Sequence, residues 1–161
     1  MSARVQADPS TQLRPFAPSD IADCARIYLE ARRHAFDWCP AEMFSLADFR
    51  ADTLGERVTV AEAAGGVCGL VSVMPADGFI HLLMVDPVWH RQGIGSVLLD
   101  HATTVLGPRA WLKCQSANHG ALAFYRARGW HVTPGGSNPI GPWSYVSRSG
   151  PVSAFDGWRG E

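Results

Sequence analysis

A nearly unbroken apolar run from Phe79 to Val85, interrupted at His81, predicts a strand that leads into a helix. Such a run is typical of a strand buried on both faces. Asp86-Pro87 is expected to end the strand, because proline has no N–H to donate to a neighbouring strand. After a glycine-containing turn, apolar residues recur at helical spacing until Gly107-Pro108, at positions 94, 97, 98, 102, 105 and 106.

The rest of the chain alternates between strand-like and helix-like patterns. Ser19 is a candidate N-cap for a helix with apolar side chains on one face, at positions 21, 24, 25, 28 and 29. Gly65-Gly66 predicts a hairpin turn, and Gly129 stands where a helix needs a left-handed C′ residue. This order of elements indicates an α/β domain of mixed arrangement. The predicted strands are 13–16, 57–63, 67–74, 79–85, 110–114, 130–133 and 143–146; further helices are expected near 41–50 and over 118–128, and a loop over 134–139.

The turn at 92–96, Gln-Gly-Ile-Gly-Ser, is suited to bind a phosphate. The first N–H groups of the following helix have no intrahelical partner, and the helix dipole adds about half a positive charge there. Glycine lets a phosphate approach the backbone without meeting a Cβ atom. A Walker A loop does not fit, because Ser96-Val97 follows Gly95 where Lys-Ser/Thr is required. A dinucleotide fingerprint does not fit either, because its third glycine is missing.

Length and charge narrow the class of protein. The 161 residues suffice for one domain with a sizeable core. We expect a flexible N-terminus over 1–10, a domain over 11–147 and a C-terminal tail over 148–161. The net charge of −1 gives no general electrostatic drive toward nucleic acid or an anionic membrane. No apolar run approaches transmembrane length and no signal peptide opens the chain, so we expect a cytoplasmic location.

The cysteines and histidines indicate neither a disulfide framework nor a metal site. The cysteines form no CxxC pair, which favours buried free thiols in a reducing compartment. The histidines other than His81 show no ligand spacing such as HxxxH. We therefore expect no metal. The residues concerned are Cys24, Cys39, Cys68 and Cys114, and His34, His90, His101, His119 and His131.

Two segments resemble motifs of the GCN5-related N-acetyltransferase family. Val85-Asp86-Pro87 followed by His90-Arg91-Gln92-Gly93-Ile94-Gly95 is similar to the family's pyrophosphate loop, Gln/Arg-x-x-Gly-x-Gly/Ala, with His90 in place of Gln or Arg. Because that loop binds phosphate mostly through main-chain N–H groups, we expect this replacement to alter affinity rather than abolish binding. Asn118-x-x-Ala121-x-x-Phe124-Tyr125-x-x-x-Gly129-Trp130 resembles a second family motif, with Trp130 replacing Phe. The motifs occur in the family's order and separation, and the resemblance covers about residues 11–146.

The resemblance implies the acyl-CoA N-acyltransferase fold, a mostly antiparallel central sheet flanked by helices, with acetyl-CoA or coenzyme A as the cofactor. It also implies that the sheet splays after the 79–85 strand and that pantetheine lies there like an added strand, bound by backbone groups. A plain core strand is compatible with the same residues. The residues expected to contact the cofactor are Leu83, Met84, Val85, Arg91, Gln92, Gly93, Ile94, Gly95, Ser96, Asn118, Ala121 and Phe124.

The resemblance also implies a role for Tyr125, since the family's tyrosine at this position lies beside the thioester sulfur. Attack by an amine expels a thiolate, and a phenol with a pKa of about 10 can donate a hydrogen bond to that sulfur and protonate it. Tyr125 is therefore the candidate general acid. Taken alone, the motif fits an equally simple structure, an Asn118 helix cap with Phe124 and Tyr125 packed in the core.

His81 is the candidate general base. The attacking amine must lose a proton, and a histidine is the one ionisable side chain on the 79–85 strand. Strict alternation would place it on one face with Phe79, Leu83 and Val85. A hydrogen-bonded structural histidine fits the same position, and Asp37 and Glu62 are rival bases.

The acceptor amine is not legible in the sequence. Aromatic and acidic residues that could line its pocket are Phe36, Asp37, Trp38, Trp143 and Tyr145, although aromatic residues are equally common in cores. A small-molecule amine and a peptide amine both stay open as acceptors, and a homodimer stays open as the assembly.

The favoured function is an acetyl-CoA-dependent N-acetyltransferase that transfers an acetyl group to a primary amine by direct attack in a ternary complex. Neither motif contains a cysteine, which argues against a covalent acyl-enzyme. The alternatives are a non-catalytic acyl-CoA-binding regulatory module and a protein N-terminal or lysine acetyltransferase. An open acidic groove would favour a protein acceptor, whereas a closed aromatic pocket would favour a small molecule.

Overall fold

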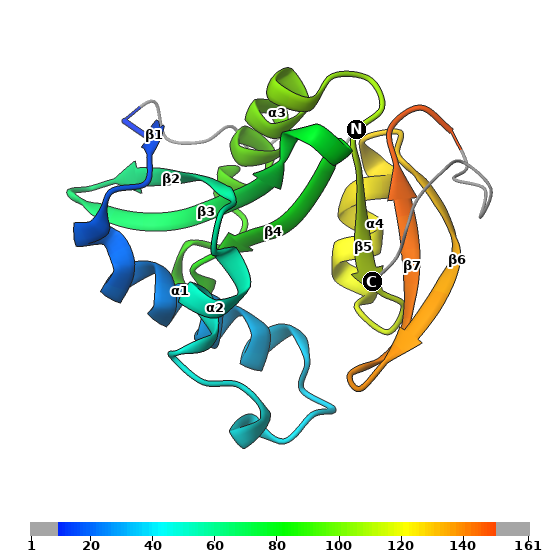
Figure 1. Cartoon of the computed structure of the whole chain (residues 1–161), viewed down its shortest axis with the longest axis horizontal. Helices are drawn as coiled ribbons and strands as arrows, with labels where there is room; N and C mark the ends of the chain where they lie inside the picture. Colours follow the sequence, from blue (N-terminus) through cyan, green and yellow to red (C-terminus); the bar gives the residue numbers. More distant parts are fainter. Residues whose placement is uncertain (1–9, 151–161) are drawn as a thin grey trace.

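The computed structural model describes residues 10–150, whose framework is a seven-stranded sheet in the order β1-β2-β3-β4-β5-β7-β6 (Figure 1). Every neighbouring pair is antiparallel except β4 and β5, which run parallel. The chain is thus the predicted mixed α/β domain with a mostly antiparallel sheet. The strands are β1 (Gln12–Pro15), β2 (Arg57–Ala63), β3 (Gly66–Met74), β4 (Phe79–Val85), β5 (Trp111–Gln115), β6 (His131–Asn138) and β7 (Gly141–Ser147). The predicted terminal segments 1–10 and 148–161 lie outside the described residues, apart from residue 10 and residues 148–150.

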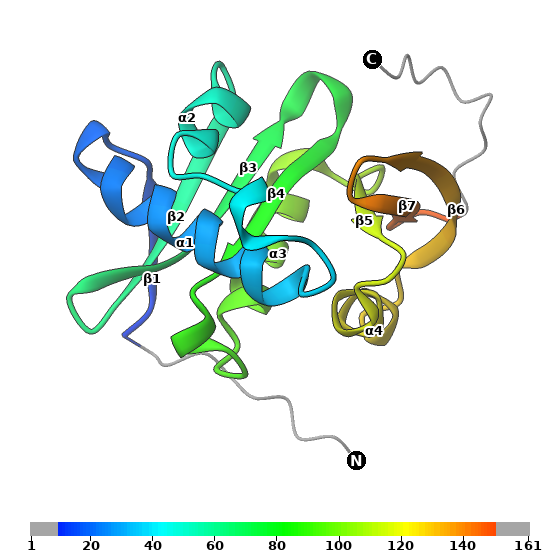
Figure 2. The ribbon, with the colours of Figure 1, turned by 90° about the horizontal axis from the view of Figure 1, so that it is seen from below.

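Within residues 10–150, four α-helices cover the sheet: α1 (Ile21–Ala35), α2 (Asp48–Thr53), α3 (Ile94–Leu106) and α4 (His119–Ala127). Side chains of α1 and α2 form one core cluster with β2, β3 and β4, whereas side chains of α3 and α4 form a second cluster on the other face. Figures 1 and 2 show β5, β7 and β6 with α4 standing apart from β1 to β4. The sheet therefore consists of two parts that meet where β4 and β5 pair.

Two glycines fit the sheet for different reasons, one for its backbone conformation and one for the lack of a side chain. The β2–β3 hairpin forms as predicted, but its positive φ angles fall on Ala64 (48°) and Gly65 (78°) rather than on Gly66. Gly69 lies where β3 passes under α3, and a Cβ there would stand 3.0 Å from Leu98 Cδ1 and 3.0 Å from the Met84 carbonyl oxygen. The absence of a side chain at Gly69 therefore lets α3 pack directly on the sheet.

A β-bulge in β4 corrects the alternation that the sequence predicted. Val73 pairs with Ile80 and Ser72 with Leu82, so His81 is the extra residue. As a result, Ile80 belongs to the core cluster that Leu83 and Val85 flank, while Leu82 and Met84 pack into the opposite cluster. The expectation of burial on both faces was also wrong. Ile80 and Leu82 are buried, but the other five residues of β4 are half-exposed.

Three local predictions differ from the structure. Ser19 lies inside a short 3-10 turn, Pro18–Asp20, and Asp20 rather than Ser19 occupies the N-cap position of α1. The helix expected over 41–50 is a 3-10 turn at Ala41–Met43 followed by α2, because Phe44 adopts an extended conformation between them. The loop expected over 134–139 is largely β6, whose register shifts between Pro134 and Ser137.

Within residues 10–150, no helix has the length and apolar character required to cross a membrane. All four cysteines are free. Three of them are buried, as predicted, whereas Cys39 is partly exposed.

Asp20 ties the N-terminal strand to the start of α1. Its carboxylate accepts hydrogen bonds from both terminal nitrogens of Arg14, each at 2.8 Å, and from the Ala17 backbone N–H at 2.8 Å. The Arg14 guanidinium holds the pKa of Asp20 below its usual range. The same arginine also pairs with the more exposed Glu62. Asp20 is 5% exposed, so of the two carboxylates that pair with Arg14 it contributes more to the stability of the fold.

We predict that Asp20→Asn lowers the free energy of unfolding at pH 7 by about 1.5–3 kcal/mol, because hydrogen bonds to a charged group are lost. The folded-state pKa is depressed, so this stabilisation is present above the unfolded-state value of about 3.9 and is lost as pH falls through the folded value. Denaturant unfolding at pH 7 and pH 3 should show a smaller difference between wild type and variant at pH 3.

Glu62→Gln is the matched control. Its side chain is 37% exposed, so the expected loss is below about 1 kcal/mol. Equal losses for the two variants, or a loss from Asp20→Asn that does not depend on pH, would contradict this account.

Candidate active site

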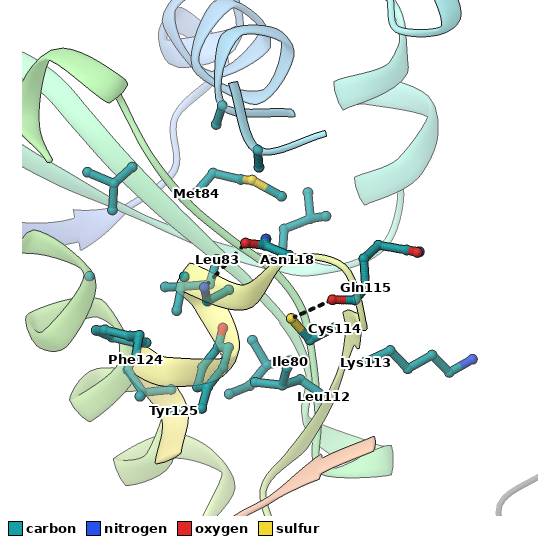
Figure 3. Close-up of a pocket in the computed structure, with 18 of the residues that line it drawn as sticks. Ile80, Leu83, Met84, Leu112, Lys113, Cys114, Gln115, Asn118, Phe124 and Tyr125 are labelled. Atoms are coloured by element: carbon teal, nitrogen blue, oxygen red, sulfur yellow. Dashed lines mark hydrogen bonds between the residues drawn. The ribbon is translucent and has the colours of Figure 1, made fainter. Parts of the chain in front are cut away.

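The parallel pairing of β4 and β5 ends almost as soon as it begins. The register contains two residue pairs, Phe79 with Trp111 and Ile80 with Leu112. Beyond them β5 continues to pair with β7, and β4 continues to pair with β3. The two strands therefore diverge and border a cleft of about 2500 Å³ that is lined by β4, β5, α1, α3 and α4 (Figure 3). The edge of β4 beyond Ile80 thus faces this cleft instead of a neighbouring strand.

The predicted glycine turn opens into this cleft. Arg91 and Gly93 have positive φ angles of 64° and 79°, and Gly93 is the N-cap of α3 without a side-chain hydrogen bond to the helix end. A Cβ at Gly95 would stand 3.6 Å from the Phe124 ring, which is ordinary contact, so protein packing does not itself demand a glycine there. The predicted residues Arg91, Gly93, Ile94, Gly95 and Ser96 line the cleft, whereas Gln92 is exposed outside it. The turn therefore presents helix N–H groups to the cleft, as an anion site requires.

Arg128, at the C-terminal end of α4, adds a positive charge beside this turn. Its guanidinium donates a hydrogen bond to the Ser96 hydroxyl and lies 3.7 Å from the centroid of the Phe124 ring. On the other side of the turn, the rings of His34 and His90 meet edge to face at 5.2 Å. Arg128 lies inside the second sequence motif, between Tyr125 and Gly129. It was not predicted, because the motif allows any residue at this position.

Helix α4 supplies the other wall of the cleft. The Asn118 side-chain oxygen caps the helix by accepting a hydrogen bond from the Ala121 N–H at 3.2 Å, so the simple capping role holds. Asn118, Ala121, Phe124 and Tyr125 all line the cleft as well. Figure 3 shows the side chains of α4 directed toward those of Leu83 on β4 and Cys114 on β5. The same helix face is therefore both packed and directed at the cleft.

Tyr125 is buried, with 6% of its surface exposed. Its ring packs edge to face on Phe124 and tilted against Trp130. Burial raises the pKa of its phenol above the usual value, because the charged phenolate is disfavoured there. Its hydroxyl has no hydrogen-bond partner among the described residues. Tyr125 therefore remains a protonated donor directed into the cleft.

Cys114 lies close to Tyr125 on the other side of the cleft, although it belongs to neither sequence motif and was not predicted as a site residue. Its thiol is 8% exposed and lies 3.6 Å from the Gln115 carbonyl oxygen. Burial raises the pKa of this thiol to about 11. At neutral pH the sulfur is a thiol rather than the nucleophilic thiolate.

His81 lines the cleft from the bulge of β4 and is held by an acidic partner that the sequence did not reveal. Its Nδ1 lies 2.7 Å and 2.8 Å from the two carboxylate oxygens of Glu56. Of the rival bases, Asp37 lines the cleft, whereas Glu62 lies outside it and pairs with Arg14. No spacing rule could have joined Glu56 to His81, because the bulge that brings them together depends on strand pairing.

The end of the cleft beyond His81 has an aromatic wall. The rings of Phe79 and Trp111 lie 4.5 Å apart, and Tyr145 packs against both Trp111 and Trp143. Tyr145 supports this wall without lining the cleft itself. The Nζ of Lys113 lies 4.5 Å from the centroid of the Trp143 ring. Phe79 and Trp111 were not anticipated, because each belongs to an apolar stretch that reads as core.

A contact between distant loops closes this aromatic end. The Trp38 indole N–H donates a hydrogen bond to the Ile140 carbonyl oxygen at 3.0 Å, joining the segment after α1 to the β6–β7 turn. Phe36 and Trp38 pack together at 5.4 Å, and both line the cleft with Asp37.

Across the part of the chain that the structure describes, no group of three His, Cys, Asp or Glu side chains is arranged to hold a metal.

Comparisons with known proteins agree with one another. Residues 21–130 match the model of the family described as "Acetyltransferase (GNAT) family". The chain is 27% identical over 116 residues to the ribosomal protein bS18-alanine N-acetyltransferase of Escherichia coli, a match that covers 66% of this chain and 73% of the relative.

Two solved structures share the fold. The apo form of YjaB from Escherichia coli has a TM-score of 0.70 at 18% identity, over 88% of this chain and 99% of that one. The PaiA N-acetyltransferase from Thermoplasma acidophilum, solved in complex with coenzyme A, has a TM-score of 0.65 at 14% identity, over 86% of this chain and 99% of that one. At these identities the likeness concerns the fold alone.

We predict that Gly95→Asp raises the dissociation constant for coenzyme A about tenfold or more, which corresponds to 1.4 kcal/mol. An aspartate in the first turn favours the helix through its dipole, so the fold should persist while the new charge repels a diphosphate at the turn. Isothermal titration calorimetry with coenzyme A measures the change.

Ala22→Asp is the matched control, since it places the same residue in the first turn of α1, at an exposed position outside the cleft. The control should leave the affinity unchanged. A folded Gly95→Asp protein that binds coenzyme A as tightly as the wild type would remove the diphosphate from this turn.

Proposed function

Because the chain belongs to the acetyltransferase (GNAT) family, we propose that it transfers the acetyl group of acetyl-CoA to a primary amine by direct attack in a ternary complex. The observation that carries this proposal is the divergence of β4 from β5. It joins an anion-binding turn, a buried phenol and a histidine in one cleft. A cleft with these groups at its walls offers separate places for a diphosphate, a thioester and an attacking amine.

The residues of the cleft fit acetyl-CoA in three respects. The uncapped N-terminus of α3 suits a diphosphate, and Arg128 adds a positive charge next to it. The unpaired edge of β4 at Leu83, Met84 and Val85 suits an extended arm with amide groups, bound as a strand would be. When bound, acetyl-CoA supplies an acetyl group activated as a thioester. Asn118, Ala121 and Phe124 would border the arm from α4.

Tyr125 and His81 would handle the two protons of the reaction. His81 takes the proton that the amine must lose to attack, and Tyr125 donates a hydrogen bond to the departing sulfur and protonates it. The raised pKa of Tyr125 supports its role, because a phenol that stays protonated at neutral pH can act as a donor. The two groups lie in the same cleft but on different walls, β4 and α4.

Direct transfer is favoured over a covalent acyl-enzyme. Cys114 is the cysteine in the cleft, and burial raises the pKa of its thiol to about 11. No described basic side chain is hydrogen-bonded to its sulfur. A thiol without an adjacent base is a weak nucleophile. The acceptor amine itself is therefore the proposed nucleophile.

The acceptor end of the cleft favours a compact primary amine with an apolar or aromatic group. Phe79, Trp111 and Trp143 form an aromatic wall, and the Trp38–Ile140 contact closes that end of the cleft. This end therefore resembles an aromatic pocket for a small group more than an open acidic groove for a protein. A peptide N-terminal amine is the second candidate, because the similar bS18-alanine N-acetyltransferase of Escherichia coli acts on a protein. We also propose a cytoplasmic location, where acetyl-CoA is available.

A panel of amines distinguishes these functions. We predict release of free thiol from acetyl-CoA with aromatic or aliphatic primary amines, faster than with peptides that begin with alanine. The reverse order would identify a protein N-terminal acetyltransferase. Tight binding of acetyl-CoA without release of thiol for any amine or peptide would contradict catalysis and favour a regulatory acyl-CoA-binding module.

We predict that Tyr125→Phe lowers kcat by about 10²-fold or more and leaves the dissociation constant for coenzyme A nearly unchanged, because the ring remains and the proton donor is lost. Steady-state kinetics and calorimetry measure the two quantities. If kcat is unchanged, Tyr125 is not the acid. If both quantities change together, Tyr125 holds the cofactor instead of serving the chemistry.

A further inference from the structure

Glu56 comes from outside both sequence motifs and contacts His81, which lines the cleft, although Glu56 itself does not line it. It lies in the turn between α2 and β2, where its backbone N–H donates to the Thr53 carbonyl oxygen at 2.9 Å. Its carboxylate is 8% exposed and contacts Nδ1 of His81 through both oxygens, at 2.7 Å and 2.8 Å. The hydroxyl of Ser72, a fully buried residue, donates to the same carboxylate at 2.7 Å. Three segments therefore converge on one buried carboxylate.

We propose that Glu56 is a positioning residue that fixes the tautomer of His81, with the proton on Nδ1 and the lone pair of Nε2 left for the acceptor amine. An ionised carboxylate can only accept hydrogen bonds, so the Nδ1 that faces it must be the donor. In a neutral imidazole the other nitrogen is then the acceptor. This inference rests on the proposed function, in which His81 receives the proton of the amine.

The ring of His81 is restrained from two sides. Nδ1 is held by Glu56, and the ring stacks on Phe79 with centroids 5.9 Å apart and planes 24° from parallel. Ser72 on β3 pairs with Leu82, and the bulged residue His81 directly precedes Leu82 on β4. The side chains of Ser72 and His81 are therefore close enough for one carboxylate to contact both. Nε2 has no hydrogen-bond partner among residues 10–150, and His81 lines the cleft. The lone pair is thus available to a bound acceptor.

The contact with Ser72 makes Glu56→Gln an informative substitution. Oε1 accepts from Ser72, and Nδ1 lies 2.8 Å from Oε1 and 2.7 Å from Oε2, so an amide at this place would present both an acceptor and a donor to Nδ1. The variant therefore no longer requires the proton on Nδ1, and the tautomer with the proton on Nε2, which cannot serve as the base, becomes populated. Glu56→Asp keeps the charge and the acceptor-only character, although its side chain is one methylene shorter.

We expect Glu56→Gln to lower kcat about 10²-fold with little change in the KM for the amine, and Glu56→Asp to restore part of the loss. Glu62→Gln is the matched control, because it makes the same change in β2, at a residue that pairs with Arg14 and lies outside the cleft. It should leave kcat unchanged. Equal kcat for wild type and Glu56→Gln in a protein that acetylates amines would overturn this role for Glu56 while leaving the proposed function standing.

The tautomer can be read without any activity. In 15N-histidine-labelled wild-type protein at a pH where the ring is neutral, two-bond 1H–15N NMR correlations should show a protonated Nδ1 and an unprotonated Nε2 for His81, assigned with His81→Gln. Glu56→Gln should raise the share of the tautomer that is protonated on Nε2. Protonation of Nε2 in the wild type would overturn the proposal even if Glu56→Gln does not fold. This NMR measurement tests the tautomer whether or not an acceptor amine has been found.

Discussion

The structure depends on a strand pairing that is left incomplete. β4 and β5 share two residue pairs and then separate, while each continues to pair with an antiparallel partner on its other side, β3 and β7. A sheet edge inside a protein would normally have to be covered, since unpaired backbone N–H and C=O groups are costly to bury. Here the edge of β4 faces a cleft, where an extended ligand can take the place of the missing strand. The two core clusters lie on opposite faces of the sheet, and one of them contains residues of both β4 and β5.

Every group proposed to act in acetyl transfer is placed by this opening. The turn before α3 directly follows β4, so it lies at one end of the cleft, and α4 directly follows β5, so Tyr125 lies on the opposite wall. His81 lines the cleft from the bulge of β4, where strict alternation is interrupted. The surroundings of these side chains set different protonation states. Burial keeps the Tyr125 phenol and the Cys114 thiol protonated, whereas the carboxylate of Glu56 contacts the imidazole of His81.

Much of this arrangement could be predicted from the sequence, because its signals are local. The apolar run of β4, the glycine turn with α3 and the Asn118 cap with α4 each lie within about thirty consecutive residues, and all formed as expected. The features that were missed are those decided by pairing between distant segments. The bulge at His81 depends on the register with β3, and Glu56 reaches His81 across 25 positions. The extension of β6 through two glycines depends on Trp143, since a Cβ at Gly136 would lie 2.8 Å from its ring.

The central claim is that an acyl-CoA fills the opening between β4 and β5, and a crystal structure of the protein with coenzyme A tests it most directly. This account predicts the diphosphate against the N–H groups of residues 93–96, the pantetheine arm along the edge of β4, and the sulfur near the Tyr125 hydroxyl. Electron density for the nucleotide elsewhere, with the opening between the two strands empty, would contradict it.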